Sequence, residues 1–238
     1  MSATYLSDST RTVATTEFRS SRIAGFAGLF FALFVGMVNV LVGSMAPPAF
    51  DASANDISAF IADNKVMLTV ASGATPLGVI ALFFFLSGVF PVLSARSNES
   101  AFWARLGVAG LIVIEIMFMT RMLFEVVLIA NADSLNAEPL LLETLWQFQN
   151  SAMTFNGLAI ALAIFGLSRA AQLSGLIPAW QAMLGYASAL GFLVAAMGVV
   201  SALEGSVLGI VGLPAFLAWL VWLALISVRL LRADRATA

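Results

Sequence analysis

Six apolar stretches of 23 to 29 residues dominate this chain of 238 residues. A helix needs about 20 mainly apolar residues to cross the hydrocarbon core of a bilayer, so each stretch is long enough for one crossing. Hydrophobicity does not alternate with a period of two residues, as it would in the strands of a membrane β-barrel. We therefore predict an all-α polytopic membrane protein. Its six-helix bundle has spans at about 23–45, 66–93, 102–130, 145–167, 179–203 and 207–231.

The composition agrees with a membrane protein and excludes several kinds of chemistry. Hydrophobic residues make up 61% of the chain and charged residues 10%, against roughly 45–50% and 25% in soluble domains. The chain has no His and no Cys, which excludes bis-His haem, Zn–His sites, thiolate chemistry, iron–sulfur clusters and Ser-His-Asp catalysis. We therefore expect no catalytic set, no cofactor and no metal. A net charge of −2 without a basic patch predicts no nucleic-acid partner.

The basic residues predict the orientation of the bundle. If the six helices alternate in direction, nine of the eleven basic residues fall on one side: Arg11, Arg19, Arg22, Arg96, Arg105, Arg169, Arg229, Arg232 and Arg235. Lys65 alone falls in a loop on the other side, and Arg121 lies inside a span. Because cytoplasmic loops carry the excess of Lys and Arg, both termini are predicted to be cytoplasmic.

Three further segments complete the organisation of the chain. Residues 1–22 are rich in Ser and Thr and are predicted to be a flexible cytoplasmic tail, followed by one transmembrane domain over 23–232 and a second tail at 233–238. The outer loop between the first two spans carries Ile57, Phe60 and Ile61. This spacing predicts a short amphipathic helix on the outer surface of the bundle.

The third span contains three charged residues, Glu115, Arg121 and Glu125. Each costs roughly 2.5–3.5 kcal/mol at the centre of a membrane helix unless it is paired and faces inward. Arg121 and Glu125 are four residues apart, about 40° around the helix, so we expect them to pair. Glu115 lies about 120° away from Arg121 and about 9 Å along the axis. It therefore needs a partner on another helix, or it carries a proton at neutral pH.

Polar residues on neighbouring spans supply candidate partners. The fourth span begins with one polar helical face, formed by Glu143, Gln147, Asn150 and Thr154. Further polar groups are Asn156 deeper in that span, Asn39 in the first span, and Lys65, Thr69 and Ser72 on one face of the second. We predict a polar, outward-facing pocket between the second, third and fourth spans, with ligand-binding residues Glu115, Arg121, Glu125, Gln147 and Asn150. The alternative is that these groups only hydrogen-bond the helices together.

Three functions are compatible with these residues. The first is a non-enzymatic membrane protein that binds a small or amphipathic ligand in the polar pocket. The second is a small secondary transporter or channel, proton-coupled through Glu115. The third, an intramembrane enzyme, is disfavoured because Glu115 and Glu125 lie about 15 Å apart along their helix. The expected partners are the lipid bilayer, a small or lipid-like ligand, and either a homo-oligomer or a larger membrane complex.

Four short motifs resemble an uncharacterised bacterial family of six-span membrane proteins, catalogued as domain of unknown function 4386. They are Ile57-Ser58-Ala59-Phe60-Ile61-Ala62-Asp63-Asn64, Arg121-x-x-x-Glu125, Leu176-Ile177-Pro178-Ala179-Trp180 and Leu213-Pro214. The resemblance extends from about residue 23 to 232. It implies the six-span fold and a bacterial cytoplasmic (inner) plasma-membrane location. It implies no activity and assigns no site residues.

Overall fold

The computed structural model describes the backbone of residues 3–203 and 208–233 and the side chains of 20–201 and 211–232. Within this part of the chain every regular element is a helix, which confirms the all-α prediction. The helices are α1 (Ala3–Ser44), α2 (Ala54–Ser94), α3 (Asn98–Ala130), α4 (Ala132–Leu135), α5 (Pro139–Phe155), α6 (Gly157–Leu173), α7 (Ala179–Met197), α8 (Val199–Leu203) and α9 (Leu208–Ala233).

Five helical segments are long and apolar enough to cross a membrane. They are Ser20–Ser44, Ala54–Ser94, Pro139–Leu173, Ala179–Met197 and Val211–Arg232. These segments make the chain a multi-pass membrane protein by length and composition. α3 is not among the five, although its 33 residues extend over about 50 Å. It is the helix that carries Glu115, Arg121 and Glu125.

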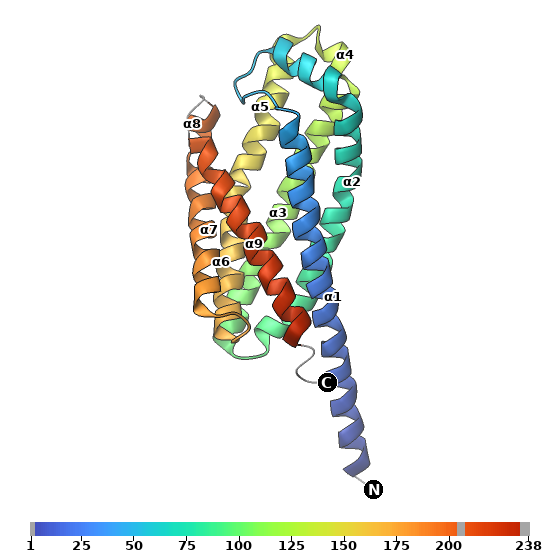
Figure 1. Ribbon diagram of the computed structural model, residues 1–238, viewed down its shortest axis with the longest axis vertical. Coiled ribbons are helices and arrows are strands. Elements are labelled where there is room, and N and C mark those ends of the chain that lie inside the picture. The colour runs from blue at the N-terminus through green and yellow to red at the C-terminus, as the bar shows by residue number, and fades with distance from the viewer. Residues whose placement is uncertain (1–2, 204–207, 234–238) are drawn as a thin grey trace.

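The long helices form a closed ring in cross-section. α1 packs on α2, α2 on α3, α3 on α6, α6 on α7, α7 on α9, and α9 returns to α1. Figure 1 shows them running side by side along the long axis, with α5 continuing α6 towards the upper end. α1 and α9 lie side by side near the lower end and diverge upwards. The ring therefore closes tightly at one end and less tightly at the other.

Small residues allow α3 and α6 to approach each other very closely. A Cβ on Gly110 of α3 would lie 2.6 Å from the main-chain nitrogen of Ala163, and one on Gly166 of α6 would lie 2.6 Å from that of Gly107. Close backbone approach at small residues is a common means of association between membrane helices. This contact fixes α3 against the bundle along its lower half.

The predicted outer helix is present, but it is continuous with the second span. Ser53 is the N-cap of α2, and its side chain accepts a hydrogen bond from the Asp56 N–H. The first turns of α2 lie across the upper end of the bundle before the helix turns to run along it (Figure 1). Ile57, Phe60 and Ile61 are buried there against the upper ends of α3 and α5. The apolar stripe therefore covers the end of the bundle.

Other helices differ from the expected spans in extent. The fourth span is divided into α5 and α6 at Asn156, and the fifth into α7 and α8. α1 begins at Ala3, so it includes most of the segment 1–22 that we expected to be a tail; the mobility of that segment stays a prediction. Arg235 lies outside the described residues, and the side chains of Arg11 and Arg19 lie outside the described side chains.

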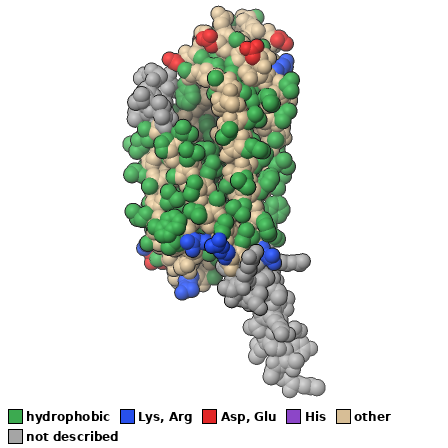
Figure 2. All heavy atoms as spheres, viewed as in Figure 1, with side chains coloured by type: hydrophobic (Ala, Val, Ile, Leu, Met, Phe, Trp, Pro, Cys, Tyr) green, Lys and Arg blue, Asp and Glu red, His purple; other side chains and the backbone are tan. Residues whose placement is uncertain are grey.

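The charged side chains gather at the two ends of the molecule. Figure 2 shows a broad apolar band between an upper end with Asp and Glu side chains and a lower end where Arg side chains predominate. Large apolar side chains on the outside of the band are exposed, for example Leu33, Val40, Val66 and Leu123. A bilayer covers such a band, because an exposed apolar surface of this extent is unfavourable in water.

Candidate functional site

A cavity of about 370 Å³ lies inside the helical ring. Residues from α1, α2, α3, α5, α6, α7 and α9 line it. Aromatic side chains make up much of the wall: Phe31, Phe34, Phe118, Phe192, Phe216 and Trp219. The polar side chains in the wall are Asn39, Thr75, Glu115, Thr154 and Asn156. The volume is within the range of about 300–1,000 Å³ that is common for ligand pockets.

Glu115 is the one ionisable side chain among the described residues of this wall. Its exposed fraction is 2%, and its Oε2 atom has no hydrogen-bond partner among the described residues. Glu115 follows the buried Ile114 on the face of α3 that turns towards the interior of the ring. A buried carboxyl without a partner is costly, because it has lost its hydration and gained nothing in return.

Asn156 stands at the junction between α5 and α6 and also has an exposed fraction of 2%. Its Nδ2 atom donates to the main-chain carbonyl of Ile114, at 3.4 Å, whereas its Oδ1 atom is buried without a partner. Gly157 follows, and a Cβ there would lie 2.9 Å from the carbonyl oxygen of Phe192. The junction therefore fits closely against α7 and brings the Asn156 amide beside the residue that precedes Glu115.

Helices surround the cavity, but it is open on one side. Its residues on α1 and α9 include the exposed Asn39 and Leu213, the latter 58% exposed. These residues belong to the upper halves of two helices that diverge in this direction (Figure 1). A separate apolar groove of about 200 Å³ lies between α3 and the α5–α6 pair, and Asn156 lines this groove too. Asn156 thus lines both the cavity and the groove.

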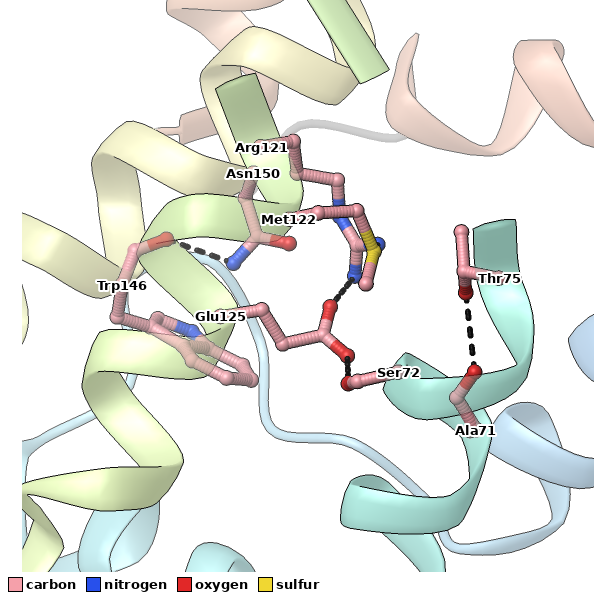
Figure 3. A network of polar contacts seen from close by, with 8 residues as sticks. All are labelled: Ala71, Ser72, Thr75, Arg121, Met122, Glu125, Trp146 and Asn150. Atoms are coloured by element: carbon pink, nitrogen blue, oxygen red, sulfur yellow. Dashed lines mark hydrogen bonds and ion pairs between the residues drawn. The ribbon is translucent and has the colours of Figure 1, made fainter. Parts of the chain in front are cut away.

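The predicted Arg121–Glu125 pair is present, but it does not line the cavity. Arg121 Nη2 lies 2.5 Å from Glu125 Oε2, and the Ser72 hydroxyl of α2 donates to Glu125 Oε1 at 2.7 Å. Figure 3 shows the Glu125 carboxylate between these two side chains. The Arg121 and Glu125 side chains are 23% and 12% exposed. Their geometry links α3 to α2: Ser72 hydrogen-bonds to Glu125 Oε1, whereas Oε2 forms an ion pair with Arg121 and accepts no hydrogen bond.

The other predicted residues on the fourth span lie apart from the cavity. Asn150 Nδ2 donates to the Trp146 carbonyl of its own helix at 2.9 Å (Figure 3). Gln147 is exposed, and its carbonyl accepts the Ser151 hydroxyl. Of the five predicted ligand-binding residues, the structure places only Glu115 in the cavity wall.

The remaining members of the predicted polar face of the fourth span, Glu143 and Thr154, lie in different places. Glu143 Oε1 accepts the main-chain N–H of Ala54 at 2.9 Å, which ties the start of α2 to α5. Thr154 lines the cavity.

Several important residues were not among the predicted site residues. The sequence pattern identifies Asn156 and Asn39 only as further polar groups, and both line the cavity. It does not identify Thr75, which also lines the cavity, or Gln149, which is buried with its Oε1 atom unpartnered. A usable signal was the spacing of seven residues between Gln149 and Asn156, which places them on one helical face.

Neither metal chemistry nor similarity to known proteins adds to this description. Among the side chains of residues 20–201 and 211–232, no group of three or more acidic residues is arranged to hold a metal ion. No protein-family model, curated protein or solved structure matches this chain. The geometry of the cavity therefore carries the functional argument.

Proposed function

We propose that this chain is a non-enzymatic, six-span integral membrane protein that binds a small amphipathic ligand in the cavity beside Glu115. The observation that carries the proposal is the combination of an apolar, aromatic wall with two buried, unpartnered acceptors, Glu115 Oε2 and Asn156 Oδ1. An apolar ligand body gains from contact with the wall. A polar end group of the same ligand satisfies acceptors that are costly when left unpaired.

The six-span topology rests on α3 as the additional crossing. α3 lies in the ring between α2 and α6, and its length of about 50 Å exceeds the roughly 30 Å hydrocarbon core. α1 begins and α9 ends at the same end of the molecule (Figure 1), which requires an even number of crossings. The excess of Arg at that end favours cytoplasmic termini. The resemblance described above suggests a bacterial inner membrane.

The position of the cavity alters our expectation of where a ligand enters. We expected a vestibule between the second, third and fourth spans that opens to the outside. The cavity instead extends across the ring to α1 and α9, where Asn39 and Leu213 are exposed. Since these two helices face the bilayer, an amphipathic ligand enters sideways from the outer half of the membrane.

The surroundings of Glu125 support a binding role over an enzymatic one. A general acid–base mechanism with two carboxyl groups requires both within reach of one substrate. Glu125 is engaged by Arg121 and Ser72, outside the cavity wall that contains Glu115. A pair of carboxyl groups acting on one bound molecule is therefore disfavoured.

Binding can be tested with brominated eleven-carbon amphiphiles, because bromine quenches nearby Trp fluorescence and Trp219 lines the cavity. Protein in lipid nanodiscs is titrated with 11-bromoundecanol, 11-bromoundecylammonium and 11-bromoundecanoate. We expect saturable quenching by at least one probe, and we expect Trp219→Phe to remove the saturable component. Quenching that rises linearly with every probe, and equally in Trp219→Phe, would refute ligand binding in this cavity.

A matched pair of variants separates the cavity from the lipid-facing surface. Val35→Phe/Val38→Phe adds two rings to the cavity wall, since both valines line it on α1. Leu33→Phe/Val40→Phe adds two rings to the same helix at positions that are 73% and 74% exposed. We expect the first variant to weaken saturable binding and the second to leave it unchanged. Equal effects of the two variants would place the probe on the lipid-facing surface.

Transport is a second candidate function, favoured by a carboxyl group in the wall of a cavity inside the helical ring. Transporter sites often lie near the bilayer midplane. Coupling to protons would use Glu115, which lines the cavity. In proteoliposomes with an imposed pH gradient, Glu115→Gln should abolish gradient-driven uptake of a bound probe. An unchanged flux would remove the coupling role.

A further inference from the structure

The polar side chains of the cavity share one property: they direct hydrogen-bond donors to the main chain. Thr75 Oγ1 donates to the Ala71 carbonyl at 2.9 Å, and Thr154 Oγ1 donates to the Asn150 carbonyl at 3.0 Å. Asn39 Nδ2 donates to the Val35 carbonyl at 2.9 Å.

Asn156 follows the same pattern, because its Nδ2 atom donates to the Ile114 carbonyl. The hydroxyl and amide oxygens of these four residues keep their lone pairs as acceptors, and each of the two Asn amides also keeps one N–H donor. The cavity therefore presents mainly acceptors to an occupant.

When ionised, Glu115 adds negative charge to this set of acceptors. An ionised carboxylate is an acceptor only, with two oxygens for about four hydrogen bonds. No basic side chain is among the described residues of the cavity wall. The nearest cation along α3 is Arg121, whose guanidinium pairs with Glu125. The protein thus supplies Glu115 with no counter-ion from the described part of the wall.

The aromatic rings of the wall favour the same kind of occupant. Phe31 and Trp219 pack edge to face with their ring centres 5.8 Å apart, and Phe192 and Phe216 adjoin the same indole at 6.2 and 6.0 Å. The faces of aromatic rings attract cations, most strongly at Trp, and the attraction increases where water is excluded. The same rings contact the apolar body of a ligand.

We propose that the ligand of this cavity is an ammonium-bearing amphiphile, whose charged head group binds between Glu115 and the acceptor oxygens of Asn156 and Thr75. This inference rests on the proposed function and names its ligand class. A primary ammonium has three N–H donors and no acceptor, which matches a wall of acceptors. An anionic head group would place a second negative charge beside Glu115. A neutral alcohol has only one donor for the several acceptors present.

The three brominated probes test this assignment because they differ only in the head group. In the wild type we expect 11-bromoundecylammonium to bind at least about tenfold more tightly than 11-bromoundecanol, because hydrogen bonds to an ionised group are roughly twice as strong as neutral ones. The undecanoate should bind most weakly. Affinities are taken from the Trp219-dependent quenching and are corrected for the partition of each probe into protein-free nanodiscs.

Two carboxyl variants of α3 complete the experiment. Glu115→Gln keeps the shape of the side chain and should remove the preference for the ammonium probe, leaving the alcohol within about twofold of its wild-type affinity. Glu99→Gln is the matched control, since Glu99 lies in the first turn of α3, far from the cavity, and its side chain is 58% exposed. It should leave all three affinities unchanged.

The possible outcomes test the ligand class and ligand binding independently. If the ammonium and alcohol probes bind equally, and Glu115→Gln changes neither, the ammonium assignment is wrong and binding in the cavity still holds. Tightest binding of the undecanoate also overturns the assignment. If no probe shows saturable quenching, the proposed function fails and the assignment fails with it. If Glu115→Gln does not fold, the order of the three probe affinities in the wild type tests the ammonium assignment.

Discussion

The close contact between α3 and α6 predicts a large and specific effect of adding one methyl group. In Gly166→Ala the new Cβ would lie 2.6 Å from the Gly107 nitrogen, 2.8 Å from the Trp103 carbonyl oxygen and 2.9 Å from the Gly107 Cα. All three atoms belong to the main chain of α3, so no side chain can rotate away. Ordinary contact requires at least 3.4 Å, and the two helices must therefore separate by nearly 1 Å.

The cost of this separation follows from the loss of packing along the interface. A radial gap of about 0.5–1 Å already removes a quarter to a half of the dispersion energy of a contact. Adding a methyl group to a closely packed site typically costs about 1–3 kcal/mol. Replacing Gly by Ala in a helix also contributes up to about 1 kcal/mol of stability. A control variant must remove this second effect from the comparison.

Gly73→Ala provides that control. Gly73 lies in the interior of α2, and a Cβ there would have no atom within 4 Å. The difference between the two variants cancels helix propensity and isolates the steric term. We expect Gly166→Ala to be less stable than Gly73→Ala by about 1–3 kcal/mol in the free energy of unfolding, measured by SDS titration in mixed lipid–detergent micelles. Equal stability of the two variants, within about 0.5 kcal/mol, would refute the close packing of α3 on α6.

Three further predictions concern the topology and the polar link between α2 and α3. Because the native chain has no Cys, a membrane-impermeant maleimide should label Asp63→Cys in intact cells, and should label Asn98→Cys only after permeabilisation; the reverse pattern would invert the topology. Ser72→Ala should lower the free energy of unfolding by about 0.6–1.7 kcal/mol, since it removes a hydrogen bond to Glu125 between two helices. In the same SDS titration, Arg121→Gln alone should destabilise the protein more than Arg121→Gln/Glu125→Gln, because the single change leaves a carboxylate without its counter-ion. A double variant less stable than the single one would contradict that pairing.

The helical architecture was predictable because it depends on the total hydrophobicity of long segments and not on any single residue. About 20 apolar residues specify a membrane helix regardless of their order. The four-residue spacing of Arg121 and Glu125 was equally informative, since local helix geometry alone brings their side chains together. The burial of Asn156 was not predictable in this way. It depends on contacts with distant segments, because its amide donates to the Ile114 carbonyl and Gly157 packs against the Phe192 carbonyl.

The orientation of the fourth span shows why Gln147 and Asn150 lie apart from the cavity. This segment has two regular faces: one carries Gln147 and Asn150, and the other carries Trp146, Gln149 and Asn156. In a soluble protein the polar face would turn outward, but in a membrane bundle a polar face turns inward. Both faces contain polar residues here, so polarity alone could not decide between them. The structure buries the second face, because Trp146 fills the upper core and donates to the Ala49 carbonyl.

The two carboxyl groups of α3 illustrate how structural and functional charges can be distinguished in this bundle. Glu125 receives a guanidinium on one oxygen and a hydroxyl on the other, so its partners offset the cost of its position. Glu115 is more deeply buried, and its Oε2 atom has no partner in the described structure. A second link between helices would not explain it, because it forms none with the described residues. Burial of the Glu115 carboxyl therefore has a free-energy cost that no described side chain offsets, and the ammonium head group proposed above would offset it.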